Sequence, residues 1–287
     1  MISFPIAIVL YNPTDSTIDR ILYFIEKGII FHIFDNSQIT NEKLSNFNHP
    51  NLSYYTFNKN LGLSYSINYL CEKALINNSK TLLFFDQDPI FKMESLNYID
   101  DFLIRSESSN SSFFDTVLSV NFRDSDSKQN KLNIIETGVI NDYIYYSVYF
   151  NINSGTLYFL DKFEKFKWFE EKYFVDGVDY SLSLNTVINQ LKNIVITNVP
   201  GLNHTDEQGD SVIQIFGKKI SGRVYPLNRN FDFISSNLKL LTKTFKIRGS
   251  KPKLFLIKTL LGYVAAQVAF RFRSLFIKKS LLSDKSK

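Results

Sequence analysis

Cysteine is nearly absent from this chain: Cys71 is the only one in 287 residues. A single thiol excludes an internal disulfide and a cysteine-based zinc cluster. No G-x-G-x-x-G follows the first predicted strand and no Walker phosphate loop occurs, which disfavours a dinucleotide-binding Rossmann site and an NTPase. The first residues carry neither a basic segment nor a cleavage site, so we expect no secretory signal. A globular protein in a reducing cytoplasm fits this composition.

Acidic residues are nearly absent from the last 55 residues of the chain, where Asp284 is the only one. Residues 233–283 contain 11 Lys and Arg and no Asp or Glu, although the whole chain has a net charge of only +5. The basic character therefore belongs to the last fifth of the sequence, and the first 232 residues are acidic by comparison. We predict two domains on this basis, residues 1–232 and a basic, apolar helical tail at 233–287.

The first 90 residues alternate strand patterns with helix patterns. Apolar side chains at helical spacing predict a helix to about Lys27, capped by Asp15 or Ser16, and a second helix after Gly62. The apolar runs of strand length are Ile6–Leu10, Ile29–Phe34, Leu52–Phe57 and Thr81–Phe85. This alternation predicts an α/β fold with an open, mostly parallel sheet and helices on both faces.

Polar side chains follow the predicted strands at their carboxyl ends. They include Asn12, Asp35, Asn60 and the triplet Asp86-Gln87-Asp88. The carboxyl ends of parallel strands line one edge of a sheet, where ligands bind, so these residues should converge. Two carboxylates two positions apart can share one cation, and their oxygens suit Mg²⁺ or Mn²⁺. Such an ion usually also holds substrate phosphates.

Residues 91–150 have a less regular pattern. The Ser/Asn-rich run Ser106–Ser112 predicts a loop, and Arg123–Lys131 predicts a surface turn or hairpin. The remaining predicted elements are strands at Val117–Phe122, Leu132–Val139, Tyr143–Tyr149 and Ile194–Asn198, and a helix at Tyr180–Leu191. His204 falls in the loop after the last of these strands.

Seven short motifs occur in an order that resembles one known family. They are Tyr11-Asn12-Pro13, Asp35-Asn36-Ser37, Asn60-Leu61-Gly62-Leu63, Asp86-Gln87-Asp88, Asn153-Ser154-Gly155-Thr156-Leu157, Phe174-Val175-Asp176-Gly177-Val178-Asp179 and His204. Over roughly residues 4–237 the chain resembles the family 2 glycosyltransferases of the GT-A fold, in the bacterial rhamnosyltransferase-like branch. The resemblance rests on the order and spacing of the motifs together, since each one is short.

The resemblance implies a role for each matching position. Asp179 matches the catalytic base, and Asp176 is the second choice for that role. Asp86, Asp88 and His204 match groups around a divalent metal, with Asp88 the more direct ligand. The other matches imply contacts to the nucleotide sugar: Asn12, Asp35 at the base edge, Asn60 and Gly62 in a loop on the nucleotide, Asp86 again, and Ser154 with Gly155 under the donor sugar.

Two positions depart from the family pattern. Ser181 stands where the family usually has an acidic residue two positions after its base, and Asn185 stands where it usually has Arg. In the family an acidic residue there often helps to bind the acceptor hydroxyl, so the resemblance does not identify the acceptor of this chain. A catalytically degenerate GT-A domain that acts as a membrane scaffold is accordingly one alternative function.

The function that the resemblance implies is an inverting transfer of a hexose or deoxyhexose, most often L-rhamnose from dTDP-rhamnose, to a lipid-linked cell-surface glycan such as an O-antigen or capsule precursor. A UDP-hexose transferase for galactose or galactofuranose is the alternative on the same fold. We expect a cytoplasmic protein, peripheral at the inner face of the plasma membrane. The uncharged run Thr259–Phe270 is only 12 residues long, and its basic flanks suit an anionic membrane surface better than nucleic acid.

Overall fold

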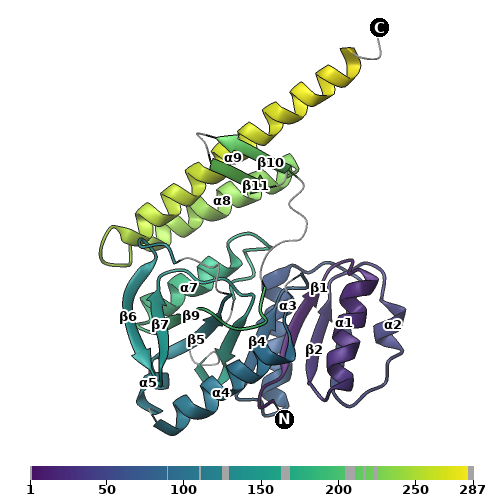
Figure 1. Ribbon diagram of the computed structural model, residues 1–287, viewed down its shortest axis with the longest axis vertical. Coiled ribbons are helices and arrows are strands. Elements are labelled where there is room, and N and C mark those ends of the chain that lie inside the picture. The colour runs from purple at the N-terminus through teal and green to yellow at the C-terminus, as the bar shows by residue number, and fades with distance from the viewer. Residues whose placement is uncertain are drawn as a thin grey trace. The chain divides into compact units, whose positions relative to one another are not determined.

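The computed structural model describes residues 2–88, 90–109, 111–124, 129–162, 169–203, 211–215, 218–222 and 225–283. The chain divides into two compact units, Met1–Thr205 and Asp206–Lys287 (Figure 1). The boundary predicted at residue 232 falls inside a helix, because the change in charge begins after Asp232 while the helix begins at Leu227. The predicted site residue His204 lies outside the described residues.

The first unit alternates strands and helices. Its helices are α1 (Asp15–Glu26), α2 (Glu42–Ser45), α3 (Leu63–Ile76), α4 (Met93–Ser109), α5 (Ser111–Asp115) and α7 (Val178–Ile188). Its strands are β1 (Ile6–Leu10), β2 (Phe31–Asp35), β3 (Leu52–Thr56), β4 (Thr81–Phe85), β5 (Val117–Phe122), β6 (Ile134–Ile140), β7 (Tyr143–Val148), β8 (Thr156–Phe159) and β9 (Lys192–Ile196).

One mixed sheet of nine strands organises this unit, in the order β3-β2-β1-β4-β8-β5-β9-β7-β6. The first four strands pair in parallel, as the β-α-β alternation predicts, and Leu10 lies beside Asp35, which lies beside Thr56. β8 then enters antiparallel between β4 and β5. The sheet is therefore parallel where the four N-terminal strands meet and mixed beyond β4.

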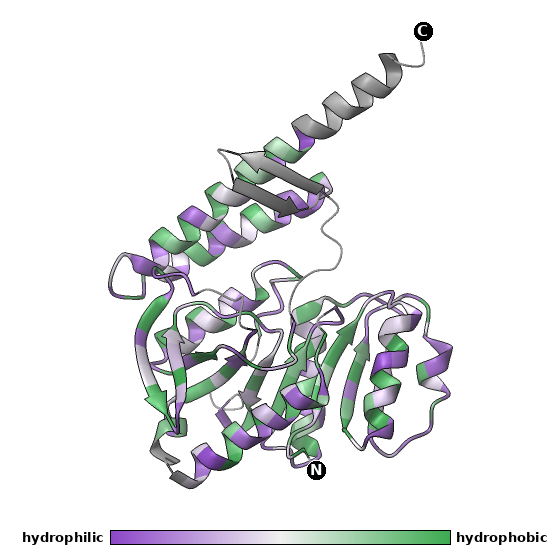
Figure 2. Ribbon diagram, viewed as in Figure 1, coloured by the Kyte–Doolittle hydropathy of each residue, from purple (hydrophilic) through white to green (hydrophobic). Residues whose placement is uncertain are grey.

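Apolar side chains from both faces of the sheet form the core. All five residues of β1 and of β2 are buried, and Figure 2 shows these central strands as largely hydrophobic. Aromatic side chains fill much of the space under the helices: Phe85 stacks on Phe91, and Phe91 stacks on Phe24 of α1, with ring centroids 4.3 and 4.8 Å apart. Cys71 of α3 is fully buried and free, as its spacing on the helix predicts.

Three local predictions are wrong. Thr14, not Asp15 or Ser16, caps α1, since its hydroxyl accepts the Thr17 N–H at 3.3 Å. The Ser/Asn-rich run does not form a loop: α4 continues to Ser109, because its apolar face packs into the core and Ser106 is fully buried. The Ser108 hydroxyl bonds to the helix itself, since it donates to the Ile104 carbonyl at 2.8 Å.

The proposed hairpin around Arg123–Lys131 is also not formed. β5 pairs with β8 and β9, while β6 pairs with β7. The apolar patterns predicted where the strands lie in the sequence but not which strands pair. In the sheet the buried strand β5 lies between β8 and β9. Sequence neighbours are therefore not partners at this point of the sheet.

The second unit contains a two-stranded antiparallel sheet and two helices. They are β10 (Ser211–Ile215), β11 (Lys218–Gly222), α8 (Leu227–Thr244) and α9 (Lys251–Ser283). Helices α8 and α9 lie side by side, with Tyr263 of α9 stacked on Phe233 of α8 at 3.8 Å between ring centroids (Figure 1). The run Thr259–Phe270 is thus the middle of a continuous helix of 33 residues.

Candidate active site

The carboxyl edge of the parallel strands brings most of the predicted residues together. Asn12 follows β1, Asp35 ends β2 and Asp86 follows β4, so all three lie at one edge. Because β8 runs antiparallel to β4 and begins there, Ser154 and Gly155 reach the same edge. The structure therefore assembles residues that are 143 positions apart in sequence, from Asn12 to Gly155.

Gln87, the middle residue of the triplet, ties the strand ends together. Its amide oxygen accepts the Tyr11 N–H at 2.9 Å, and its backbone carbonyl accepts from Arg20 Nη2 at 2.6 Å. The next residue, Asn12, donates its N–H to the Ser37 hydroxyl at 2.8 Å. This bracing role of Gln87 was not predicted, since a triplet of the form D-x-D leaves its middle residue undefined.

Asp35 is fully buried, with both carboxylate oxygens bonded. The Tyr54 hydroxyl donates to Oδ2 at 2.6 Å, and the Ser37 N–H donates to Oδ1 at 2.9 Å. Burial, followed by the hydrogen bond to Asp35, raises the pKa of the Tyr54 hydroxyl, so it remains a donor. Tyr54 was not among the predicted residues.

Gly62 directly precedes α3 and lies against Phe174, in the segment that leads to Asp179. Asn60 Oδ1 accepts the Gly62 N–H at 3.0 Å, and the Leu63 N–H donates to the Phe174 carbonyl at 2.7 Å. Gly62 has a φ of +85°, and a Cβ at this position would lie 2.7 Å from Cδ2 of the Phe174 ring. The glycine is therefore needed both for its backbone conformation and for the close approach of Phe174.

We predict that Gly62→Ala destabilises the protein by about 2–3 kcal/mol, because it adds a steric overlap to a strained φ. Gly28→Ala is the matched control: its φ is +87°, but its added Cβ meets nothing within 4 Å. The control should cost only about 1 kcal/mol. Urea denaturation of both variants measures the difference, and equal losses would rule out the role of the Phe174 contact.

Asp86 and Asp88 are exposed at the end of β4. The Asp86 N–H donates to the Ser154 hydroxyl at 3.2 Å, which anchors the triplet to the start of β8. Two exposed carboxylates fit a Mg²⁺ or Mn²⁺ ion that takes its remaining ligands from water and substrate phosphates. No group of three or more His, Cys, Asp or Glu side chains suited to a metal occurs among the described residues, which do not include His204.

Asp179 lies in the first turn of α7 and reaches the turn before β8. Asn153 Nδ2 donates to Asp179 Oδ1 at 2.6 Å, and Asn153 Oδ1 accepts from the Tyr158 hydroxyl at 2.6 Å. Asp176 precedes α7 in the same segment, and its charge also acts on Asp179. The structure thus brings the predicted base to the turn that holds Asp86. Neither Asn153 nor Tyr158 was predicted as a site residue.

Burial, together with the negative charges of Asp86 and then Asp176, raises the pKa of Asp179 to about 7, against backbone hydrogen bonds that lower it. The folded protein therefore binds this proton more tightly than the unfolded chain, in which an aspartate titrates near 4. Stability from this group is present below about pH 4 and is lost as pH rises toward 7. A carboxyl that titrates near neutral pH is suited to proton transfer.

This pH dependence can be measured by difference. Between pH 5 and pH 8 the wild type should lose about 5 °C more in Tm than Asp179→Asn, because only the wild type must ionise this carboxyl. Differential scanning calorimetry of both proteins at the two pH values tests it. Parallel Tm changes in the two proteins would contradict a raised pKa.

Arg123 follows β5 and brings a cation to the same edge. Its Nε donates to Asn121 Oδ1 at 2.6 Å and its Nη2 donates to Asn151 Oδ1 at 3.2 Å, while Asn121 Nδ2 donates to the Ser154 carbonyl at 2.7 Å. Burial lowers the pKa of Arg123, and the charges of Tyr180, Asp124 and Asp179 oppose that shift. The single arginine after β5 carried no sequence signal of its own.

The two departures from the family pattern have structural consequences. Ser181 is buried in α7, so this side chain is not offered to a ligand. Asn185 Nδ2 donates to Glu170 Oε1 at 2.8 Å. The positions that would carry acid and arginine in the family are therefore part of the packing of α7 in this chain.

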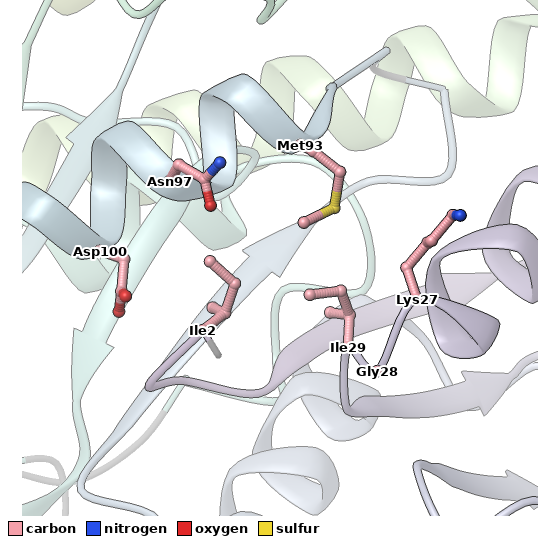
Figure 3. Close-up of a pocket in the computed structure, with 7 residues that line it drawn as sticks. All are labelled: Ile2, Lys27, Gly28, Ile29, Met93, Asn97 and Asp100. Carbon is pink, nitrogen blue, oxygen red and sulfur yellow. The ribbon is translucent and has the colours of Figure 1, made fainter.

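A separate cavity lies at the opposite, amino edge of the strands. It has a volume of about 310 Å³ and is lined by Ile2, Lys27, Gly28, Ile29, Met93, Asn97 and Asp100 (Figure 3). Its residues precede β1 and β2 or belong to α4, so none of the predicted site residues lines it. The cavity is therefore separate from the candidate active site.

Comparison with known proteins identifies the fold. No protein-family model matches the chain, and no curated protein matches it in sequence. The crystal structure of S. aureus TarS is 12% identical with a TM-score of 0.56, covering 90% of this chain and 43% of TarS. The structure of TarS 1–349 in complex with UDP is also 12% identical, with a TM-score of 0.53, covering 90% and 71%. GalNAc-T7 with UDP, GalNAc and Mn²⁺ has a TM-score of 0.49 at 11% identity, covering 68% and 42%.

These likenesses establish the architecture. The chain has a mixed α/β fold similar to that of glycosyltransferase structures, with a C-terminal helical extension, as predicted. It spans less than half the length of TarS. At this level of identity the likeness concerns the fold, so the reaction must be argued from the residues at the strand edge.

Proposed function

We propose that this chain is an inverting glycosyltransferase that moves a hexose or deoxyhexose from a nucleoside-diphosphate sugar to an acceptor hydroxyl. The observation that carries this proposal is that one turn, Asn153–Thr156, contacts both the predicted metal segment and the predicted base. Ser154 accepts the Asp86 N–H, and Asn153 donates to the Asp179 carboxylate. A leaving diphosphate and an attacking hydroxyl need these two groups on either side of one sugar.

The reaction is a single displacement at the anomeric carbon. The acceptor oxygen forms a bond to that carbon, the carbon–oxygen bond to the diphosphate breaks, and the bonding electrons leave with the diphosphate. Asp179 takes the proton of the acceptor hydroxyl, which requires its ionised form. Asp86 and Asp88 would hold a divalent cation, with His204 as a further predicted ligand, and that cation would neutralise charge on the leaving group.

The donor we propose is dTDP-rhamnose, on the resemblance to the rhamnosyltransferase-like branch. UDP-galactose and UDP-galactofuranose are the alternatives, and UDP is present in one TarS structure of the same fold. A thermal-shift panel of these nucleotide sugars, each with Mg²⁺, Mn²⁺ or EDTA, separates them. A donor at 100 times its Kd adds about 2.7 kcal/mol to the free energy of unfolding. No metal-dependent shift with any nucleotide sugar would refute the proposal.

A degenerate domain without turnover is the second candidate, favoured by the buried Ser181 and by Asn185 bonded to Glu170. It predicts metal-dependent nucleotide binding without hydrolysis or transfer. Release of free nucleotide from the donor identified by the panel decides between the two. Any release that depends on both metal and Asp179 excludes the scaffold function.

We further propose that the second unit attaches the protein to the inner face of the plasma membrane, where a lipid-linked glycan would be the acceptor. Helix α9 carries an exposed apolar stripe at spacings of three and four residues, formed by Leu254, Ile257, Leu261, Val264 and Val268. The neighbouring Lys and Arg residues have no acidic residue among them in 233–283, which suits anionic headgroups. Figure 2 shows hydrophobic and hydrophilic turns alternating along the described part of this helix.

The mode of attachment requires a test of its own. Among the described residues, the segment Lys251–Arg271 is long and apolar enough to cross a membrane by length and composition, so the short uncharged run does not exclude a span. A peripheral protein should bind vesicles that contain phosphatidylglycerol and should not bind neutral vesicles. High salt or alkaline carbonate should release it from the vesicles. Resistance to carbonate would indicate a span instead.

Leu261→Glu should abolish most vesicle binding, since it places a charge in the middle of the stripe. Val139→Glu on β6 is the matched control, with 68% exposure against 64% for Leu261. Equal binding by the two variants would rule out the stripe as the membrane contact.

A further inference from the structure

Asn153 lies between two other polar side chains and bonds to both. It is 3% exposed, and Tyr158 is 1% exposed. The Tyr158 hydroxyl donates to the amide oxygen, and the amide nitrogen donates to Asp179 Oδ1, each at 2.6 Å. Burial keeps the pKa of the Tyr158 hydroxyl well above its usual range, so the hydroxyl remains a donor. With the amide oxygen occupied by that donor, the amide nitrogen must face Asp179.

The backbone around Asn153 is held just as firmly. The Thr156 N–H donates to the Asn153 carbonyl at 2.9 Å, and Gly155 between them has a φ of +73°, which makes residues 153–156 a type II turn. The Gly155 N–H donates to the Phe84 carbonyl of β4 at 2.8 Å. The turn that contains Asn153 is therefore hydrogen-bonded to β4, the strand that Asp86 directly follows.

We propose that Asn153, oriented by Tyr158, is a positioning residue that holds the Asp179 carboxylate in place for proton abstraction from the acceptor. This inference rests on the proposed function. Asn153 and Tyr158 neither gain nor lose a proton in the step: the acceptor proton passes to Asp179, and the amide holds one carboxylate oxygen while the other receives the proton. The Asn153–Asp179 bond also favours the ionised carboxylate, because a donor to a carboxylate stabilises the charged form.

The charged and titratable groups around Asp179 come from several elements. Asp86 follows β4, Arg123 follows β5, Tyr158 lies in β8, and Asp176 and Tyr180 flank Asp179 in its own segment. Replacing Asn153 leaves all of these groups in the chain. A change in the titration of Asp179 in such a variant therefore reports on the amide.

The test compares Asn153→Ala and Tyr158→Phe with the wild type. A ¹³C NMR titration of the Asp179 carboxyl in the free protein should show a midpoint about 1 pH unit higher in Asn153→Ala, and a smaller rise in Tyr158→Phe. Turnover of the donor identified by the ligand panel should fall roughly 10–100-fold in kcat for Asn153→Ala with an unchanged donor KM, and its pH profile should move by the same amount as the midpoint.

Ser183→Ala is the control for a purely structural effect. The Ser183 hydroxyl donates to the backbone carbonyl of Asp179 at 2.8 Å, so this variant removes a bond to the same residue without touching its carboxylate. It should leave the midpoint in place. An unchanged midpoint in a folded Asn153→Ala protein, or an equal shift in Ser183→Ala, would overturn the proposal.

Failure of this inference is distinguishable from failure of the proposed function. Full turnover by Asp179→Asn would remove the base assignment itself. An inactive Asp179→Asn together with an unshifted Asn153→Ala would remove only the positioning role. The NMR titration needs no substrate, so it gives an answer even if turnover is never observed.

Discussion

Asp179→Asn should lower the rate of glycosyl transfer about 10²–10⁴-fold while leaving the affinity for the nucleotide-sugar donor unchanged. Asparagine has nearly the same shape as aspartate but cannot accept the acceptor proton. The carboxyl is held at the turn before β8 by Asn153, and its pKa of about 7 leaves a large ionised fraction at neutral pH. Rates under saturating donor, together with donor Kd from calorimetry, measure the two effects separately.

Asp176→Asn is the matched control for this prediction, because Asp176 lies three positions earlier in the same segment and its negative charge raises the pKa of Asp179. It should retain most of the activity, with a pH optimum moved slightly down as one negative charge is lost. If Asp176→Asn is inactive and Asp179→Asn is active, then Asp176 is the catalytic base instead.

Asp88→Ala should abolish the metal dependence of donor binding. Because two exposed carboxylates are the ligands proposed for the cation, loss of one should weaken metal-dependent affinity by more than the roughly 10–100-fold that follows from loss of an outer-shell partner. Calorimetric titration of the nucleotide diphosphate with Mn²⁺ and with EDTA measures it. Binding in EDTA should be equal in variant and wild type.

Asp142→Ala provides the control for a change of net charge. Its side chain is 95% exposed and pairs with Arg105 at 3.3 Å, and it lies in the turn between β6 and β7, in a different segment from the triplet. This variant should bind the metal–nucleotide complex like the wild type. If Asp88→Ala does the same, the assignment of the metal to this triplet is wrong.

Much of the first unit could be predicted from periodicity. The bounds of β1, β4 and β5 were predicted correctly, since short apolar runs closed by turn residues leave little freedom in a buried strand. Helix bounds were predicted less well. Helix α4 continues through Ser106, where a loop was predicted, and Ser106 is fully buried. A serine-rich composition does not reveal whether its neighbours bury enough apolar surface to continue a helix.

The residues at the carboxyl edge of the strands could be predicted for the same reason, but the hydrogen bonds of their side chains could not. Positions after β1, β2 and β4 had to converge once the strands were parallel, which located Asn12, Asp35 and Asp86. The Asp35 carboxylate accepts a hydrogen bond from Tyr54, and Tyr54 comes from β3 with no motif to mark it. Contacts of this kind depend on the register between strands, which the sequence of one strand does not specify.

The sequence by itself determined the α/β class, the parallel arrangement of the first four strands, the polar residues at their ends and the basic helical tail, because each follows from local periodicity or composition. Only the tertiary structure decided that β8 enters antiparallel beside β4, that its first turn joins Asp86 to Asp179, and that Gly62 must make room for Phe174. These features depend on contacts between segments about 26 to 111 residues apart, and such contacts are selected by packing of the whole sheet rather than by any short stretch of chain.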